Sequence, residues 1–473
     1  MNPTLIGFLG YLVAVFVIGL VSFRLTKTIG DYLLAGRKLG PWVVAFSERA
    51  SGESAWLLIG LPGVALLSGY GAVWPAIGCT FGIFFSWTFI ARRLREQTEK
   101  FGAITIPSFL ANRYNDTSHL LRWTSTTIIV FFFTLYVAAQ FLGAGKVLNA
   151  TFGWPPLSGM IVGALIILFY TIMGGFIAVV WTDFFQGFLM IATLVLLPIV
   201  GFVSLGGVDG VTEKIASFDP GLLTVGGGKT GWPAFLAALG GLGIGLGYMG
   251  QPHLIVRFMA IKKPKDLRQG MLIAVVWAVL AFWGAMLIGI VGLGMYQGSL
   301  AGDPEQVMPL LAKTLLPAVL AGILISGAIA AMMSTADSQL LVTTSAVSQD
   351  IYRSLINPRA DHKRLVSLSR VVTLGVGVVA FILAMYAESL VYDLVLYAWG
   401  GLGAAFGPPI LLTLWWKRTT KAGVFAGMLV GTITVIIWYN VTPLHDFLYE
   451  LIPGFFFSLL ATWMVSLSTT PRH

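Results

Sequence analysis

Residues 47–54 read SERASGES and residues 240–252 read GGLGIGLGYMGQP, and each stretch interrupts an otherwise apolar segment. Glycine disfavours a helix by about 1 kcal/mol per residue and proline removes a backbone donor, so both segments are predicted to unwind midway. Unwound backbone at membrane depth is tolerated only where protein or a water-filled cavity covers it. The two stretches therefore predict a polar interior within a membrane-embedded bundle. Glycine also lets membrane helices pack closely, and this second interpretation of residues 240–252 stays open.

The composition of the whole chain also indicates a membrane protein. Of its 473 residues, 57% are hydrophobic and 10% are charged, whereas an ordinary soluble domain carries roughly 25% charged residues. This excludes a soluble enzyme, a nucleic-acid binder and a disordered chain. Apolar runs of membrane-spanning length predict an all-α polytopic membrane protein with about 13 transmembrane helices, or about twelve if the weak division near residue 177 is dropped. The spans are expected at 4–24, 41–67, 70–91, 121–147, 156–177, 179–205, 232–258, 268–296, 312–349, 365–386, 389–416, 421–440 and 447–468.

Lysine and arginine are distributed unevenly between the connecting segments. If the N-terminus lies outside, the inner segments carry 24 of the 29 basic residues, including the run from Arg257 to Arg268. Cytoplasmic loops of membrane proteins are enriched in these residues. We therefore expect a multi-pass protein of the cell (inner) membrane with its N-terminus outside and its C-terminus in the cytoplasm. The net charge of +9 then reflects topology rather than a nucleic-acid partner.

The two interrupted spans stand five helices apart and enter the membrane from opposite sides. Spans 2–6, at about residues 41–205, and spans 7–11, at about residues 232–416, are expected to form two inverted five-helix repeats. Both repeats would belong to a single transmembrane transporter domain covering residues 1–473. Paired interrupted segments at corresponding positions indicate the binding site of a secondary transporter.

Five charged side chains fall well inside the expected spans: Glu48, Arg49, Glu53, Asp183 and Asp337. Such charges are costly in a bilayer and usually functional. Arg49 and Glu53 are spaced i, i+4 and could simply pair on one helix face. A pair placed at a helix break still points into a polar interior.

The densest small and polar stretch within any span reads GAIAAMMSTADSQ. On a helix, the carbonyl oxygen of Ala331 shares one face with the hydroxyls of Ser334 and Thr335. Together with carbonyls of Ala50 and Glu53 in the second span, these atoms would make a five-oxygen shell for sodium. The alternative is that both hydroxyls bond only to their own helix.

Other kinds of chemistry find no support in the sequence. The chain has no phosphate-cradling GxxxxGK[ST] loop, its histidines are scattered, and no Ser/His/Asp or Cys/His arrangement can be placed. We therefore expect a carrier rather than an enzyme, with no cofactor and with sodium as the coupling ion. An ion channel or a membrane sensor is the alternative from a different class.

Several stretches resemble the sodium:solute symporter family, most closely its bacterial sodium/proline branch. The matching stretches are GRKLGP at 36–41, WLLIGLPG at 56–63, YTIMGGFIAVVWTDFFQ at 170–186, GLGYMGQPHLIVRF at 245–258, GAIAAMMSTADSQLL at 327–341 and AWGGLGAAFGPP at 398–409. The resemblance implies a LeuT-like fold of two inverted five-helix repeats, each opening with a broken helix. It also implies alternating-access uptake of a small solute, driven by inward sodium flow.

The resemblance further implies which residues bind. The principal sodium site would use carbonyl oxygens of Ala50, Glu53 and Ala331 and hydroxyls of Ser334 and Thr335. A second sodium site, which some relatives have, would map onto Asp183, Ser334, Asp337 and Ser338, although those relatives carry a small hydroxyl residue in place of Asp337. Solute contacts would fall on Ser54, Trp56, Tyr136, Tyr248, Gln251 and Pro252.

Two positions depart from the sodium/proline pattern. That branch has an aspartate where this chain has Gly52, and Glu53 supplies a carboxylate one position later, rotated by about 100° on a helix. It also has a tryptophan at the position of Ile244, so the cavity is expected to be larger or differently shaped here. Proline is the first candidate solute. Another amino acid, a betaine, a sugar or a carboxylate, and proton coupling through Glu53, Asp183 or Asp337, stay open, as do sodium stoichiometry and oligomeric state.

Overall fold

The chain folds into a bundle of long helices, seen in a computed structural model that describes residues 2–23, 34–173, 175–387 and 390–469. The first helices are α1 (Pro3–Phe23), α3 (Pro41–Gly52), α4 (Leu61–Ser68), α5 (Val73–Phe85), α6 (Arg92–Lys100), α7 (Ile106–Arg113), α8 (Leu120–Phe152), α9 (Pro156–Met173), α10 (Phe176–Ser204) and α11 (Gly207–Phe218). They continue as α12 (Gly231–Gly243), α13 (Pro252–Ala260), α14 (Leu267–Tyr296), α15 (Val307–Leu315), α16 (Ala318–Ser345), α17 (His362–Met385), α18 (Val391–Trp415), α19 (Lys421–Asn440), α20 (Thr442–His445) and α21 (Leu451–Thr469).

Short tighter or wider helical turns link several of these helices. They are η1 (Ala35–Arg37), η2 (Trp56–Gly60), η3 (Gly69–Ala72), η4 (Ser86–Ala91), η5 (Pro220–Leu223), η6 (Ile244–Met249), η7 (Pro264–Asp266), η8 (Pro304–Gln306) and η9 (Ala346–Ile356). The part of the chain that the structure describes contains no β-strand, only an isolated bridge between Leu39 and Ile261. The predicted all-α class is confirmed.

Eleven helical stretches of the described residues are long and apolar enough to cross a membrane. The count of about 13 therefore stays a prediction: α3 and α4 are short pieces of one interrupted span, and the apolar part of α9 covers only Pro156–Phe169. The expected division near residue 177 lies between α9 and α10, although Gly174 falls outside the described residues. The expected start of the ninth span at residue 312 is wrong. Residues 312–315 belong to the separate helix α15, because the extended residue before Pro317 delays α16 until Ala318.

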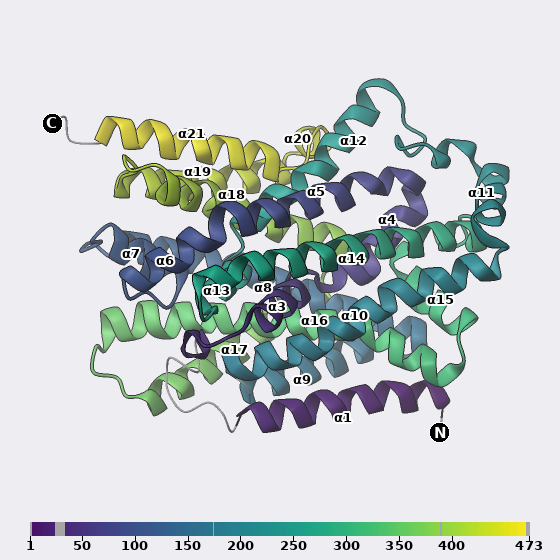
Figure 1. Ribbon diagram of the computed structural model, residues 1–473, viewed down its shortest axis with the longest axis horizontal. Helices are drawn as coiled ribbons and strands as arrows, with labels where there is room; N and C mark the ends of the chain where they lie inside the picture. The colour runs from purple at the N-terminus through teal and green to yellow at the C-terminus, as the bar shows by residue number, and fades with distance from the viewer. Residues whose placement is uncertain (1, 24–33, 174, 388–389, 470–473) are drawn as a thin grey trace.

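The helices lie roughly side by side along the longest axis of the molecule (Figure 1). The start of α1 and the end of α21 lie at opposite ends of the bundle, and α6 and α7 lie at the same end as the end of α21. This arrangement agrees with the orientation predicted from basic residues, which stays a prediction. Of the basic residues counted for the inner side, Arg24, Lys27 and Arg472 lie outside the described residues.

Both predicted helix breaks are present. Helix α3 ends at Gly52, Glu53 leaves helical geometry (φ −104°, ψ 9°), and η2 resumes at Trp56. Helix α12 passes into the tight turns of η6, Gln251 is extended (φ −82°, ψ 107°), and α13 starts at Pro252. Proline suits the first turn of a helix because its missing N–H is not needed there.

Glycine in the seventh span also serves close packing, so the second interpretation of residues 240–252 holds as well. Helix α5 lies against η6, and a Cβ atom on Gly245 would lie 2.1 Å from the carbonyl oxygen of Gly78. A Cβ atom on Gly82 would lie 2.2 Å from the carbonyl oxygen of Gly245. The two backbones therefore touch directly, as small residues allow in membrane bundles.

Helix α3 occupies the middle of the bundle. It packs against α10, α13, α14 and α16, and α13 also contacts α16. Every residue of the polar stretch 47–54 is buried. The fold thus places the first break beside α13 and α16, where polar atoms must find partners within the protein.

Candidate functional site

Oxygen atoms of α16 and of the end of α3 meet at a buried point. The Ser334 hydroxyl oxygen lies 2.9 Å from the Ala50 carbonyl oxygen and 3.1 Å from that of Ala331. The Thr335 hydroxyl donates to the Ser51 carbonyl oxygen at 2.9 Å. All five residues are buried. The structure thus gathers every residue predicted for the principal sodium site except Glu53, and adds the carbonyl of Ser51.

This oxygen set suits a small hard cation. The last carbonyls of a helix lack partners within it, and unwound carbonyls with helix C-terminal ends coordinate sodium in transporters with broken helices. The contact of Ser334 with Ala331 stays within α16, as the alternative prediction had it, but its contact with Ala50 crosses to α3. The role of the Glu53 carbonyl stays a prediction.

The side chain of Glu53 belongs to a buried cluster of charges. Arg49 forms ion pairs with both Glu48 and Glu53, so the predicted i, i+4 pair is confirmed and has a third member. The Trp87 indole N–H donates to Glu48 Oε2 at 3.1 Å. From the second break, the Tyr248 hydroxyl lies 3.3 Å from Glu53 Oε2. The cluster therefore connects the two helix breaks.

A second buried cluster surrounds Arg257. Its Nε donates to the Ser47 hydroxyl at 2.8 Å, while Nη2 lies 2.6 Å from Ser51 Oγ, 3.0 Å from Asp183 Oδ2 and 2.5 Å from Ser338 Oγ. The guanidinium is 1% exposed. Sequence analysis assigned Arg257 to the inner loop, and this is wrong, because the residue lies within α13 and its side chain points into the bundle to pair with Asp183.

The residues predicted for a second sodium site are only partly together. Asp183 and Ser338 share the guanidinium of Arg257, whereas Ser334 contacts the end of α3. Asp337 Oδ1 accepts from Ser338 at 3.2 Å. Its buried Oδ2 has no hydrogen-bond partner within the described residues.

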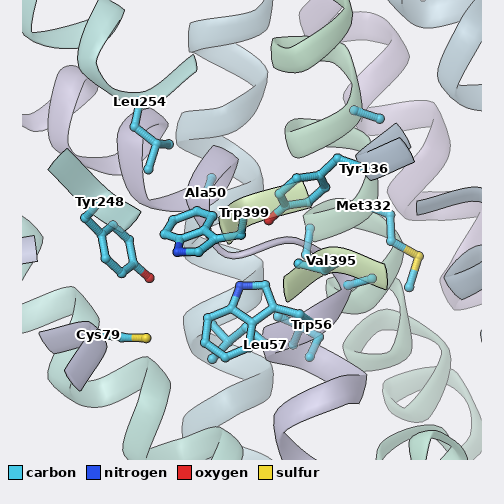
Figure 2. Packing of buried hydrophobic residues seen from close by; sticks show 14 of the residues in the cluster. Ala50, Trp56, Leu57, Cys79, Tyr136, Tyr248, Leu254, Met332, Val395 and Trp399 are labelled. Atoms are coloured by element: carbon cyan, nitrogen blue, oxygen red, sulfur yellow. The ribbon is translucent and has the colours of Figure 1, made fainter. Parts of the chain in front are cut away.

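Four of the predicted solute contacts lie around Trp399 of α18. Figure 2 shows its indole between the rings of Tyr248 and Tyr136. The Trp399 and Tyr248 rings meet edge to face with centroids 4.7 Å apart. Gln251 Nε2 donates to the Trp399 carbonyl at 2.9 Å, and the hydroxyls of Ser54 and Tyr136 lie 3.3 Å apart. These side chains bring both breaks, α8 and α18 to one place.

The other two predicted solute contacts are Trp56 and Pro252. Trp56 opens η2, and its ring packs 5.6 Å from Phe282 and 6.2 Å from Tyr392, measured between centroids. Pro252 opens α13 and lines a small cavity that also reaches Arg257.

Ile244 lies between this group and a larger cavity. Its carbonyl oxygen accepts from the Trp399 indole N–H at 3.0 Å. The cavity measures about 520 Å³, and its lining includes Ile244, Gly241, Tyr392 and the segments 225–227 and 445–449. A Cβ atom on Gly247 would lie 2.0 Å from Trp399 Nε1, so the indole lies directly across this glycine. Trp399 thereby supplies an aromatic wall beside the position where the sodium/proline pattern has a tryptophan.

Sequence analysis missed four residues of this centre: Ser51, Gln140, Arg257 and Trp399. Gln140 Oε1 accepts from the backbone N–H of Ala55 at 3.0 Å, directly after the first break. The one feature of the sequence that could have indicated Gln140 is that it is a single amide side chain within an apolar span. Trp399 and Arg257 stood inside stretches that resemble the family, but nothing in the sequence showed their side chains facing the two breaks.

Two broken helices, far apart in the chain and joined by buried oxygen and charged groups, define a secondary transporter. Residues 32–431 match the profile of the sodium:solute symporter family. The chain belongs to that family. It is 44% identical over 455 residues to the high-affinity proline transporter PutP of Bacillus subtilis, covering 96% of this chain and 95% of the relative. It is 39% identical to the sodium/proline symporter of Escherichia coli, covering 98% and 93%.

A solved structure agrees with the fold. A Na⁺-coupled sialic acid symporter, in a substrate-bound outward-open state, superposes with a TM-score of 0.82 at 19% identity, covering 100% of this chain and 99% of that one. The predicted LeuT-like fold is confirmed. The family and the relatives are transporters rather than enzymes.

Proposed function

We propose that this protein takes up proline, or a similar small amino acid, together with sodium by alternating access. The observation that carries the proposal is the contact of Ser334 with the Ala50 carbonyl, where α16 meets the broken end of α3. The similarity to proline transporters over nearly the whole chain supports the choice of solute. Sodium enters as cargo, held by the carbonyls of Ala50, Glu53 and Ala331 and the hydroxyls of Ser334 and Thr335.

Sodium binding at this point would couple to solute binding. An ion shared by α3 and α16 fixes the unwound segment after Gly52, and that segment carries Ser54 and the N–H of Ala55. Two ligands that favour one conformation raise each other's affinity, typically by about 1–3 kcal/mol. Solute affinity would therefore rise with sodium concentration.

The amino acid would lie beside Trp399. Its carboxylate suits the start of α13 at Pro252, where backbone N–H groups and the helix dipole favour a negative charge. Its ammonium suits Gln251 Oε1, which is buried and has no hydrogen-bond partner within the described residues. The ring of proline would pack on Tyr248 and Trp399.

Transport would proceed by rocking of one group of helices, drawn from both inverted repeats, against the remaining helices. The first repeat comprises about residues 41–205 and the second about residues 232–416, within one domain. With the N-terminus outside, the cavity of about 520 Å³ is the outer approach. Inward sodium flow down a membrane potential contributes about 2.3 kcal/mol per charge at 100 mV.

Uptake by the purified protein in proteoliposomes tests the proposal. We expect an inward sodium gradient to drive proline accumulation, and counterflow of proline to identify a carrier rather than a channel. Accumulation driven by a proton gradient in sodium-free buffer would instead favour proton coupling through Glu53, Asp183 or Asp337. Faster uptake of a betaine, a sugar or a carboxylate than of proline in the same assay would show that this compound, rather than proline, is the solute.

A further inference from the structure

The guanidinium of Arg257 is held the way a bound cation is held. Oxygen atoms of Ser51, Asp183 and Ser338 surround Nη2 at 2.5–3.0 Å. Nε donates to Ser47, and Nη1 donates to the carbonyl of His253. Every nitrogen of this buried guanidinium therefore has an oxygen partner, as a buried charge requires.

The same oxygens are those predicted for a second sodium ion. Asp183 and Ser338 both belong to that set, and each contacts Arg257 Nη2. A sodium ion bound by both would lie where Nη2 lies. The guanidinium would have to leave first, and it would then lose its buried carboxylate partner, which is strongly unfavourable.

We propose that Arg257 is a tethered cation that permanently fills the second cation position, so that one sodium ion accompanies each solute. The inference rests on the proposed function, because it concerns the stoichiometry of the same sodium coupling. Arg257 acts here as a positioning residue: it joins α13 to α3, α10 and α16, as a shared ion would.

Stoichiometry of the unaltered protein provides the first test. Proteoliposomes are loaded with proline, and the proline gradient that just stops net flux against a tenfold sodium gradient is measured at zero voltage. One sodium ion per proline predicts a balancing gradient of about tenfold, and two predict about a hundredfold. A hundredfold gradient overturns the inference and leaves sodium coupling intact. Proline flux that does not depend on the sodium gradient would overturn the proposed function itself.

Substitution of Arg257 provides the second test, read by binding of radioactive sodium to the purified full chain. We expect one sodium ion per chain for the unaltered protein and for Arg257→Lys, which keeps a tethered charge. Arg257→Gln should bind two, with a Hill coefficient for sodium rising from about 1 toward 2. One sodium ion bound to a folded Arg257→Gln variant would overturn the inference. Arg95→Gln is the matched control, since Arg95 is also buried but lies away from this cluster and donates to Ile261 and Glu99; it should bind one.

Discussion

The hydroxyl of Ser334 lies 2.9 Å from the carbonyl oxygen of Ala50, although 284 positions separate the two residues in the chain. This contact joins α16, from the second predicted repeat, to the broken end of α3, from the first. A cation bound between them would hold both repeats at once. The relationship therefore links ion binding to the movement that transport requires.

Loss of the two hydroxyls of α16 should weaken sodium binding. The variants Ser334→Ala and Thr335→Ala each remove one predicted ligand. A loss of about 1–1.4 kcal/mol, the size of one hydrogen bond, raises the half-saturating sodium concentration about five- to tenfold. Proline affinity at saturating sodium should change less. Ser326→Ala is the control. The hydroxyl of Ser326 is buried in the same helix, and its one hydrogen bond among the described residues is to its own turn at Gly322. If the half-saturating sodium concentration is unchanged in both site variants, the assigned ion site is wrong.

A methyl group on Gly247 should displace the indole of Trp399. The added Cβ atom would lie 2.0 Å from Nε1, so the indole must leave Tyr248 and give up its hydrogen bond to Ile244. We expect proline affinity to fall by about tenfold or more, since a buried hydrogen bond and an aromatic contact are lost. Gly240→Ala is the matched control, with its nearest neighbour at 3.8 Å. Equal proline affinity in the two variants would show that Trp399 is not part of the solute site.

Ile244→Trp should strengthen binding if proline is the natural solute. Ile244 lines the cavity of about 520 Å³, which leaves room for an indole. An added aromatic contact of about 1 kcal/mol predicts roughly fivefold tighter proline binding. Ile244→Leu should leave affinity within about twofold. Looser proline binding in the tryptophan variant would indicate a bulkier or differently shaped solute.

The loop between α7 and α8 carries a pH-dependent contact. Burial acts to raise the pKa of Asp116, but hydrogen bonds from Lys421, Ser118 and the Leu121 N–H outweigh it, so the pKa lies below its usual value. A depressed pKa means that the contact stabilises the fold above the unfolded pKa of about 3.9. That stability is lost as pH falls through the lower folded value.

Lys421→Met should therefore lower the free energy of unfolding at pH 7 by about 1 kcal/mol. The difference from the unaltered protein should shrink below about pH 3.9. Thermal unfolding of the detergent-purified protein between pH 3 and 7 measures it. Lys417→Met, which removes an exposed lysine nearby, should show no such pH-dependent difference. A constant difference across the whole range would contradict the assigned role of Asp116.

Local patterns predicted the breaks and the nearby pairings well. Glycine, proline and charge within an apolar run act on the backbone where they stand, so both breaks follow from their own sequence. The spacing of Arg49 and Glu53 likewise sets their pairing on one helix. Ala331 and Ser334 share a face for the same reason, and the carbonyl of Ala50 was expected to join them because a broken helix end leaves carbonyls without partners.

Contacts between distant helices could not be predicted in the same way. Arg257 stands near the end of an apolar run, where an arginine usually reaches the loop. Its inward direction depends on where Asp183 and Ser338 lie, and those positions are fixed by packing of α10 and α16. The position of Trp399 could not be predicted for the same reason. Its indole lies across Gly247 because α18 packs against η6.

The backbone contact between Gly78 and Gly245 limits how the carrier can open. Since neither position has room for a side chain, α5 and η6 cannot slide past each other without separating main chain from main chain. One of these elements precedes the midpoint of the chain and the other follows it, yet we expect them to move together as one rigid body. We therefore expect the hinge that exposes the solute to either side of the membrane to lie elsewhere, at the boundary between α5 with η6 and the helices around α16.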